Sequence, residues 1–481
     1  MKISKTSSTR IHTTDFTNLK FGTVFSDHML ICKYKDGEWG EAEIRPYGPI
    51  DMTPGSQVLH YGQSVFEGMK AFKNSDDEVL LFRKEENFKR INKSAERLYI
   101  PKITENIFMD GLDKLISLDS DWCKNEDGYS LYIRPFIFAS GECIKASASE
   151  EYTFIIITSP TTRYYPGDLN VVVEQYYSRA AKGGVGFAKA AGNYAASFYP
   201  TKMANSRGFT QVVWTDSIEH KYIEEAGTMN VWVRIDDTLI TPELSDSILG
   251  GITRDSIITL AKDKGIVVQE RKLSIDDVVE AHRNGRLIEA FGTGTAVTVS
   301  PIDSITVGEE RLELNHKSDS FASLLKKSLQ GIQNGTLEDK FGWTSKVNEV
   351  AFQTVSKGML FGNGMEGIPE SNFTINNAKE WGAFLEKIAI ENKVSTNFSK
   401  VTIDFSEHIL VCVFDTIRNT GGFEIEIETI FIEKNGVNIQ YSTKKPGPTD
   451  MVTMVVTQPY HLVKTEKREG PITFINKDNV Q

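Results

Sequence analysis

The spacing of hydrophobic positions divides most of the chain into short strands and amphipathic helices. Continuous apolar runs predict strands at residues 79–83, 131–138, 152–157, 169–173, 211–214, 229–235 and 287–291. Apolar residues at helical spacing predict helices at residues 85–99, 255–264, 275–284 and 378–391. Residues 422–433 (G-F-E-I-E-I-E-T-I-F-I-E) alternate apolar and charged side chains, which is typical of a half-buried strand. The pattern predicts an α/β protein followed by a small β-rich C-terminal domain.

Two segments rich in proline and glycine mark the expected domain boundaries. Residues 160–168 (P-T-T-R-Y-Y-P-G-D) lie between two apolar runs, and residues 358–369 (G-M-L-F-G-N-G-M-E-G-I-P) precede a change in composition. We therefore expect a small N-terminal α/β domain over residues 1–160 and a linker over 161–168. A larger domain is expected over 169–355, and the β-rich domain over 370–481.

Composition and charge narrow the classes of protein and partner. The 481 residues include 54 Lys and Arg against 65 Asp and Glu, a net charge of −11 at pH 7, which argues against binding along a nucleic-acid backbone. No apolar run approaches the roughly 18 residues of a membrane span, and the polar N-terminus does not resemble a signal peptide. The 4 cysteines and 8 histidines are dispersed, without the spacing of a disulfide framework or a metal site. We expect a cytoplasmic protein with no metal, nucleic acid or membrane as a partner.

The stretch around Lys189 is unusually poor in charge. Residues 183–199 (G-G-V-G-F-A-K-A-A-G-N-Y-A-A-S-F-Y) hold one charged side chain, where average composition gives about four. Among glycine, alanine and phenylalanine the amine of Lys189 is expected to be desolvated, which makes it a nucleophile able to bond to a carbonyl group. The alternative is a glycine-rich loop whose lysine reaches the surface, and this window alone does not decide between the two.

Four other segments hold candidate binding groups. The acidic pair in residues 224–230 (E-E-A-G-T-M-N) either holds a positive charge on a ligand or forms a solvated turn. Residues 250–254 (G-G-I-T-R) and 291–296 (F-G-T-G-T-A) offer backbone amides and hydroxyls suited to a phosphate or carboxylate, although ordinary turns look similar. Neither fits a nucleotide-binding motif. Residues 60–72 (H-Y-G-Q-S-V-F-E-G-M-K-A-F) form either an apolar pocket wall or a plain core segment.

Taken in order, these segments resemble one family. The series H-Y-G-Q-S-V-F-E-G-M-K-A-F, R-I-N-K-S-A-E-R-L, L-Y-I-R-P, K-G-G-V-G-F-A-K-A-A-G-N-Y, E-E-A-G-T-M-N, G-G-I-T-R and F-G-T-G-T-A is similar to that of the branched-chain-amino-acid aminotransferases. These are pyridoxal 5'-phosphate (PLP) enzymes of fold type IV. The resemblance covers roughly residues 16–350, and it is specific because so many motifs recur in one order. It implies PLP as the cofactor, a homodimer, and two α/β domains with the active site between them.

The resemblance also implies which residues bind the cofactor. Lys189 matches the lysine that bonds covalently to the cofactor aldehyde, Glu225 the carboxylate beside the ring nitrogen, and Tyr194 the tyrosine on the phenolic oxygen. The residues matched to the phosphate group are Arg97 (in K-S-A-E-R), Ile252, Thr253 and Thr295. Lys189, Glu225 and Tyr194 are then the expected catalytic residues.

Substrate contacts follow from the same resemblance. The backbone amides of Thr295 and Ala296 match the receptor for the substrate α-carboxylate, and Arg134 matches the arginine that meets the second carboxylate of glutamate. The walls of the side-chain pocket are matched to Tyr61, Phe66, Tyr132 and Phe25. The implied reaction is reversible transfer of the amino group of L-leucine, L-isoleucine or L-valine to 2-oxoglutarate by a ping-pong mechanism. Residues 296–299 read A-V-T-V, so no C-x-x-C thiol switch is expected there.

Two rival interpretations remain at this point. One is another fold-type-IV enzyme, a D-amino-acid transaminase or a 4-amino-4-deoxychorismate lyase, although Y-I-R-P and G-N-Y-A-A-S favour the branched-chain group. The other is a binding or scaffold protein that retains the fold without activity, against which the intact Lys189, Glu225 and Arg97 argue.

The C-terminal residues contain motifs that differ from those of this family. V-T-I-D-F-S, T-G-G-F-E-I-E-I, P-G-P and V-T-Q-P-Y-H-L-V-K resemble the C-terminal domain of PrcB, over roughly residues 374–464. This resemblance implies a small β-rich domain that contacts a protein partner. The alternative is a fused domain that only covers surface or assists assembly.

Overall fold

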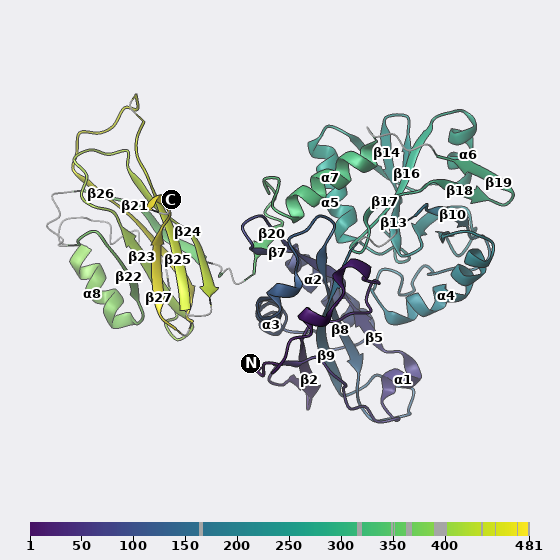
Figure 1. Cartoon of the computed structure of the whole chain (residues 1–481), viewed down its shortest axis with the longest axis horizontal. Coiled ribbons are helices and arrows are strands. Elements are labelled where there is room, and N and C mark those ends of the chain that lie inside the picture. Colours follow the sequence, from purple (N-terminus) through teal and green to yellow (C-terminus); the bar gives the residue numbers. More distant parts are fainter. Residues whose placement is uncertain are drawn as a thin grey trace. The chain divides into compact units, whose positions relative to one another are not determined.

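The chain folds into two units, Met1–Val347 and Asn348–Gln481, shown in Figure 1. The structure is a computed structural model that describes residues 1–162, 167–314, 320–347, 350, 352–361, 368–388, 402–433, 436–447, 449–468 and 470–479. Within this part of the chain, no helix is both long enough and apolar enough to cross a membrane.

The first unit begins with a sheet in the order β1-β4-β2-β9-β8-β6-β7-β20, with β3 beside β2 and β5 beside β8. Its strands are β1 Lys2–Ile3, β2 His28–Lys35, β3 Glu38–Trp39, β4 Glu43–Pro46, β5 Ser64–Phe66, β6 Met69–Lys73, β7 Val79–Phe82, β8 Ser130–Ala139, β9 Tyr152–Thr161 and β20 Thr344–Lys346. Helices α2 (Lys84–Arg97) and α3 (Glu105–Leu118) add their apolar faces to its core, and the short α1 (Gln57–Tyr61) precedes β5. Leu30, Phe108 and Phe154 are fully buried in this core, and burial of each stabilises the fold by about 1.5–3 kcal/mol.

The second sheet of this unit has the order β15-β14-β13-β12-β11-β10-β18-β19, with β16 beside both β13 and β17. Its strands are β10 Asn170–Val173, β11 Gln211–Thr215, β12 Ile223–Ala226, β13 Met229–Ile235, β14 Thr238–Thr241, β15 Val267–Glu270, β16 Leu287–Gly294, β17 Thr298–Pro301, β18 Ser304–Val307 and β19 Glu310–Glu313. Its helices are α4 Ala191–Ser206, α5 Ile252–Asp263, α6 Ile275–Arg283 and α7 Phe321–Gln333. Helix α6 starts at a capping box, in which Ser274 and Asp277 each accept the other's backbone N–H.

The chain passes between the two sheets where the linker is expected. Strand β9 ends at Thr161 and β10 begins at Asn170, while residues 163–166 lie outside the described part of the chain.

The boundary of the C-terminal unit lies earlier in the sequence than expected. The sequence predicts that the large domain extends to residue 355, but β21 (Phe352–Phe361) pairs with β26 (Thr457–Glu466) inside the second unit. Gly358, which suggested a seam, lies within β21, where it faces the ring of Tyr460.

The second unit consists of two sheets and one helix. One sheet has the order β21-β26-β23-β22, and the other has the order β24-β25-β27. The further elements are β22 Ser371–Ile375, α8 Ala378–Ile388, β23 His408–Phe414, β24 Glu424–Glu433, β25 Gly436–Lys444 and β27 Ile472–Asn476. Alternate residues of β23 pack against α8 and against the other sheet, so this strand is buried on both faces. The predicted architecture is confirmed: an α/β first unit is followed by a small β-rich C-terminal unit.

His461 joins the two sheets of this second unit. Its Nδ1 accepts the backbone N–H of Ile427 at 2.9 Å, and its Nε2 lies 2.9 Å from the Thr354 hydroxyl. Both partner strands have irregular register at this point, after Thr354 in β21 and after Ile427 in β24. The ring is 2% exposed, and burial, with a further contribution from Lys357, lowers the pKa of His461 to about 4.

This depressed pKa predicts acid sensitivity of the second unit. As the pH falls from 6.5 towards 4, an unfolded chain binds a proton at residue 461 while the folded chain does not, so the unfolding free energy decreases. The loss is on the order of 3 kcal/mol. Hydrogen exchange of the β26 amides, corrected for intrinsic rates, measures it in the full chain. His461→Gln should flatten the dependence, whereas His408→Gln should keep the wild-type slope; equal slopes in all three proteins would contradict the prediction.

Candidate active site

A cavity of about 670 Å³ in the first unit contains most of the predicted site residues. It is lined by residues from both sheets and from the N-terminal ends of α4 and α5. The predicted residues that line it are Phe66, Tyr132, Arg134, Lys189, Tyr194, Ile252, Thr253, Thr295 and Ala296. The cavity therefore joins segments that lie far apart in the sequence.

Lys189 is held in place by its own backbone. Its N–H donates to the Ser94 hydroxyl at 2.9 Å, and its carbonyl accepts the N–H of Phe66 at 3.0 Å. Its Nζ donates to the Tyr194 hydroxyl at 2.7 Å and lies 4.8 Å from the centre of the Phe66 ring. Because Tyr194 lies in the first turn of α4, the helix start orients both side chains into the cavity. The side chain is partly buried, as the scarcity of charge around it predicts.

Glu225 does not line the main cavity but lies directly behind it. A small adjoining cavity contains Glu225 and Arg179 and shares Tyr194, Thr228 and Leu249 with the main one. Glu225 is 4% exposed, pairs with Arg179 Nε at 3.0 Å, and accepts the Leu249 N–H at 2.9 Å. Burial raises the pKa of the Glu225 carboxyl, while the Arg179 charge and the Leu249 N–H act against that rise. The ion pair favours the charged carboxylate.

Arg90, which the sequence analysis did not single out, lines the cavity, whereas the predicted Arg97 does not. Arg90 lines the cavity, and Glu67 binds it through both carboxylate oxygens at 2.7 and 2.8 Å. Arg90 also donates to the Gly250 carbonyl at 3.0 Å, and Asn87 donates to Glu67 at 2.7 Å. Although burial alone would raise it, the pKa of Glu67 is held below its ordinary value by the charge and hydrogen bonds of Arg90. Arg90 is therefore a fixed, charged group beside the start of α5.

Arg97 itself lies outside the cavity. It is at the end of α2, is exposed, and donates to the Gly183 carbonyl at 3.2 Å. Arg90 and Arg97 are seven residues apart, almost two helical turns, so both lie on one side of α2 about 10 Å apart along its axis. Helical spacing therefore allows either arginine to face the cavity, and only the position of α2 relative to the cavity distinguishes Arg90 from Arg97.

The start of α5 provides the second part of an anion site. Gly251 precedes the helix and gives no side-chain cap to its first amides, while Thr253 lies in the first turn. A Cβ at position 251 would lie 2.0 Å from the Asn230 Oδ1, so only glycine allows this close approach. Uncapped helix N-termini favour anions because backbone N–H groups and the helix dipole both point towards them.

One wall of the cavity combines aromatic rings with a cation. The Arg134 guanidinium lies 4.5 Å from the centre of the Phe66 ring and donates to the Tyr132 hydroxyl at 2.9 Å. Its buried Nε has no hydrogen-bond partner within the described residues. The Tyr132 hydroxyl fits against Gly68, where a Cβ would lie 2.2 Å away. This wall can therefore accept an apolar group or pair with an anion.

Two predicted wall residues lie elsewhere. Tyr61 is 46% exposed and donates to the Ile144 carbonyl, and Phe25 stacks on Tyr47 with ring centres 4.8 Å apart. Neither lines the cavity, whereas Phe21 does and meets the Tyr132 ring edge-on at 4.9 Å. The sequence holds no periodic signal at residues 19–25 that separates Phe21 from Phe25, because this segment has no helix or strand.

Comparisons with known proteins agree with this geometry. Residues 64–305 match the model of the amino-transferase class IV family, and residues 409–466 match the PrcB C-terminal model. The chain is therefore a class IV aminotransferase with an additional C-terminal domain.

Its relatives specify the family further. The chain is 46% identical to branched-chain-amino-acid aminotransferase 2 of Bacillus subtilis (strain 168), over 73% of this chain and 97% of the relative. It is 47% identical to a probable branched-chain-amino-acid aminotransferase of Staphylococcus aureus (strain N315), over 68% and 93%. The crystal structure of the Escherichia coli branched-chain amino acid aminotransferase matches with a TM-score of 0.55 at 28% identity, over 67% and 99%. The chain belongs to the branched-chain-amino-acid aminotransferase family.

Proposed function

We propose that this protein transfers the amino group of L-leucine, L-isoleucine or L-valine reversibly to 2-oxoglutarate, yielding the branched-chain 2-oxo acid and L-glutamate. The observation that carries the proposal is a single cavity in which the Lys189–Tyr194 pair shares space with aromatic rings and the Arg134 cation. The activity named for relatives at 43–47% identity supports it.

The cofactor of this proposal is PLP, which aminotransferases of this fold type use. The residues present fit it. The fixed Arg90 guanidinium, the start of α5 at Ile252 and Thr253, and Thr295 would hold its phosphate. The Lys189 amine would bond to its aldehyde, Tyr194 would meet its phenolic oxygen, and Glu225 its ring nitrogen. When bound, PLP supplies an electron sink for the negative charge that develops at the substrate Cα.

The remaining chemistry belongs to the side chains of this protein. Lys189 acts as the general base that removes the substrate Cα proton and as the acid that returns it, a role typically worth 10²–10⁴-fold in rate. Tyr194 accepts the hydrogen bond that orients the Lys189 amine. The Arg179 ion pair keeps Glu225 charged, and that negative charge stabilises a protonated ring nitrogen next to it.

The second wall of the cavity is suited to the substrate α-carboxylate. Backbone amides of Thr295 and Ala296 are the proposed donors, and the turn that carries them is braced by Lys70, whose Nζ donates to the Ala296 carbonyl at 3.0 Å. Burial lowers the pKa of Lys70 to about 8, so below that pH its positive charge also attracts a carboxylate. Arg134 then has a free buried donor for the second carboxylate of 2-oxoglutarate or glutamate.

An amino-donor panel tests the proposed function. With 2-oxoglutarate as acceptor, we expect L-leucine, L-isoleucine and L-valine to be used, and D-alanine to react roughly a hundredfold more slowly because its Cα proton points away from Lys189. Coupled measurement of glutamate gives the rates, on the full chain and on a chain ending at Val347. Preferential use of D-alanine would contradict the proposal, and loss of activity in the shorter chain would show that the first unit needs the second unit for activity.

We further propose a cytoplasmic homodimer. Aromatic and apolar side chains gather on the exposed surface beside α4, where larger apolar patches indicate an interface; they are Tyr176, Tyr177, Phe198, Tyr199 and Met203. The proposed cytoplasmic location rests on the scattered spacing of the 4 cysteines, which does not suggest a disulfide framework. The second unit is proposed to contact a protein partner, for which the exposed Met451 and Met454 provide adaptable apolar contacts.

A further inference from the structure

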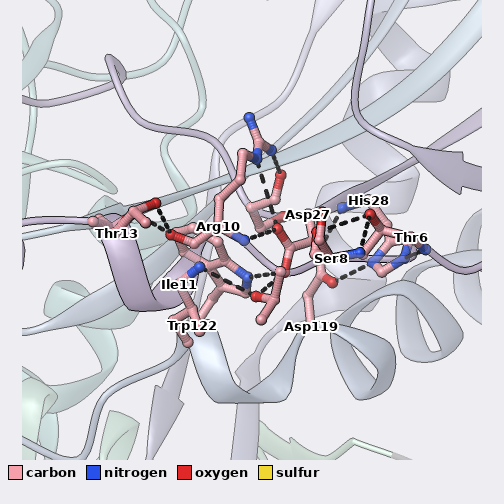
Figure 2. A network of polar contacts seen from close by, with 12 residues as sticks. Thr6, Ser8, Arg10, Ile11, Thr13, Asp27, His28, Asp119 and Trp122 are labelled. Carbon is pink, nitrogen blue, oxygen red and sulfur yellow. Dashed lines mark hydrogen bonds and ion pairs between the residues drawn. The ribbon is translucent and has the colours of Figure 1, made fainter.

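The N-terminal arm, which we define as residues 4–25, is tied down by a buried carboxylate next to β2 (Figure 2). Asp27 accepts the Thr9 hydroxyl, the Arg10 backbone N–H at 2.9 Å and the Trp122 indole N–H at 3.0 Å. The Arg10 guanidinium also donates to the Ser26 carbonyl. Asp27 therefore links the beginning of the arm, its end and the core residue Trp122.

A second anchor lies at the adjacent residue. His28 Nε2 accepts the backbone N–H of Thr6 at 2.9 Å, so this nitrogen carries no hydrogen and Nδ1 is the donor. Nδ1 lies 2.6 Å from Asp119 Oδ1, and the other oxygen of Asp119 accepts the His28 backbone N–H at 3.0 Å. Both side chains are almost fully buried, so the orientation of the ring is fixed and the arm is held at residue 6 as well.

Together the anchors close the arm into a loop whose ends touch. Residues 11–25 form a loop between Arg10 and Ser26. The hydrogen bond from the Arg10 guanidinium to the Ser26 carbonyl holds the two ends together, which is the geometry of a compact surface loop. Phe16 packs near Trp122, and its carbonyl accepts the Tyr129 hydroxyl at 3.0 Å. At the tip, both donors of Thr23 bond to the Lys20 carbonyl of the same turn. The tip is therefore placed by the ends of the loop together with the contacts of Phe16.

That tip carries Phe21 into the substrate cavity, against Tyr132. Tyr132 in turn accepts a hydrogen bond from Arg134. The arm therefore contacts the aromatic wall through Phe21, and the aromatic wall contacts the Arg134 cation through Tyr132. We propose that the arm anchor formed by Asp27, His28 and Asp119 is a positioning device that holds Phe21 in the wall for apolar substrate side chains. This inference rests on the proposed function, because it assigns part of the substrate selectivity of that cavity.

The test loosens the arm without disturbing the core. In the double variant Thr9→Val/Arg10→Met, Asp27 keeps the hydrogen bond from the Trp122 indole. It loses the hydrogen bond from the Thr9 hydroxyl and the ion pair with the Arg10 guanidinium. We expect KM for L-leucine to rise about tenfold with kcat within about twofold, since an apolar contact is lost while the chemistry is unchanged. Trypsin cleavage after Lys20 should accelerate. Thr13→Val is the matched control, because the Thr13 hydroxyl bonds to the Arg10 carbonyl and not to the anchors.

A second set of variants tests whether the effect passes through Phe21. In a Phe21→Ala background, the same double substitution should change KM by less than about twofold, because residues coupled through one contact are not additive. An equal rise in KM in both backgrounds would overturn the positioning role. So would a double variant in which KM and the Lys20 cleavage rate both match those of the wild type.

Failure of the proposed function is separately visible. A wild-type protein that uses no branched-chain amino acid would refute that function, and the cleavage rate at Lys20 would still decide whether the anchor holds the arm. Unchanged cleavage in the double variant would then overturn the anchor by itself, whereas faster cleavage would support it.

Discussion

Lys189→Ala is expected to lower transamination of L-leucine by at least about 10³-fold. The variant loses both the covalent attachment point for the cofactor and the base that moves the Cα proton, and each function alone is worth orders of magnitude. The fixed backbone of residue 189, bonded to Ser94 and Phe66, should keep the cavity folded without the side chain. Coupled glutamate formation measures the rate, and the visible absorbance of the purified protein measures covalently bound cofactor.

A lysine in the same segment provides the control for this experiment. Lys182 is exposed and lies outside the cavity, so Lys182→Ala should keep both colour and rate within about twofold of the wild type. If Lys189→Ala retained covalent cofactor or near-normal turnover, the assignment of Lys189 would be wrong, and with it the account of the site.

Arg90→Gln is expected to raise the dissociation constant for PLP by at least about a hundredfold. Arg90 is a largely buried guanidinium that donates two short hydrogen bonds to Glu67, and removing one member of such a pair costs about 3–5 kcal/mol. The thermal shift on adding PLP measures the loss, because ligand binding stabilises the folded state in proportion to its affinity. The melting temperature of each protein without PLP is measured as well, so that a lower affinity for PLP can be told apart from a lower stability of the variant itself.

Arg97→Gln is the decisive comparison. Arg97 is exposed and donates to a backbone carbonyl outside the cavity, so its replacement should alter PLP affinity by less than about threefold. The PLP affinity of Arg90→Lys should lie between those of Arg90→Gln and Arg97→Gln, since lysine keeps the charge but loses the bidentate geometry. A large loss of affinity in Arg97→Gln with little effect in Arg90→Gln would reverse the assignment drawn from the structure.

The local pattern of the sequence was sufficient for the elements it predicted, whereas helices α3, α4 and α7 were not predicted from it. The strand predicted at residues 229–235 is β13, Met229–Ile235, and the helix predicted at residues 275–284 is α6, Ile275–Arg283. Of the alternating residues 422–433, Glu424–Glu433 form β24, with Ile425, Ile427 and Ile430 buried. These elements were predictable because their periodicity records which face is buried. The boundary near residue 355 was misplaced, because Gly358 lies inside β21, paired with β26, instead of ending the strand.

The sequence by itself determined the class of enzyme and the residues that lie in short motifs, such as Lys189, Tyr194 and Thr253. A motif keeps its residues together wherever the chain places it, so their identity is readable without coordinates. Only the tertiary structure shows that Arg90 and Phe21 line the cavity, and that Arg97 and Phe25 do not. The two arginines share a segment, as do the two phenylalanines, and which of them lines the cavity depends on how far α2 and the arm extend along a cavity built from both sheets. That distance is set by packing between segments far apart in the chain, which no local periodicity records.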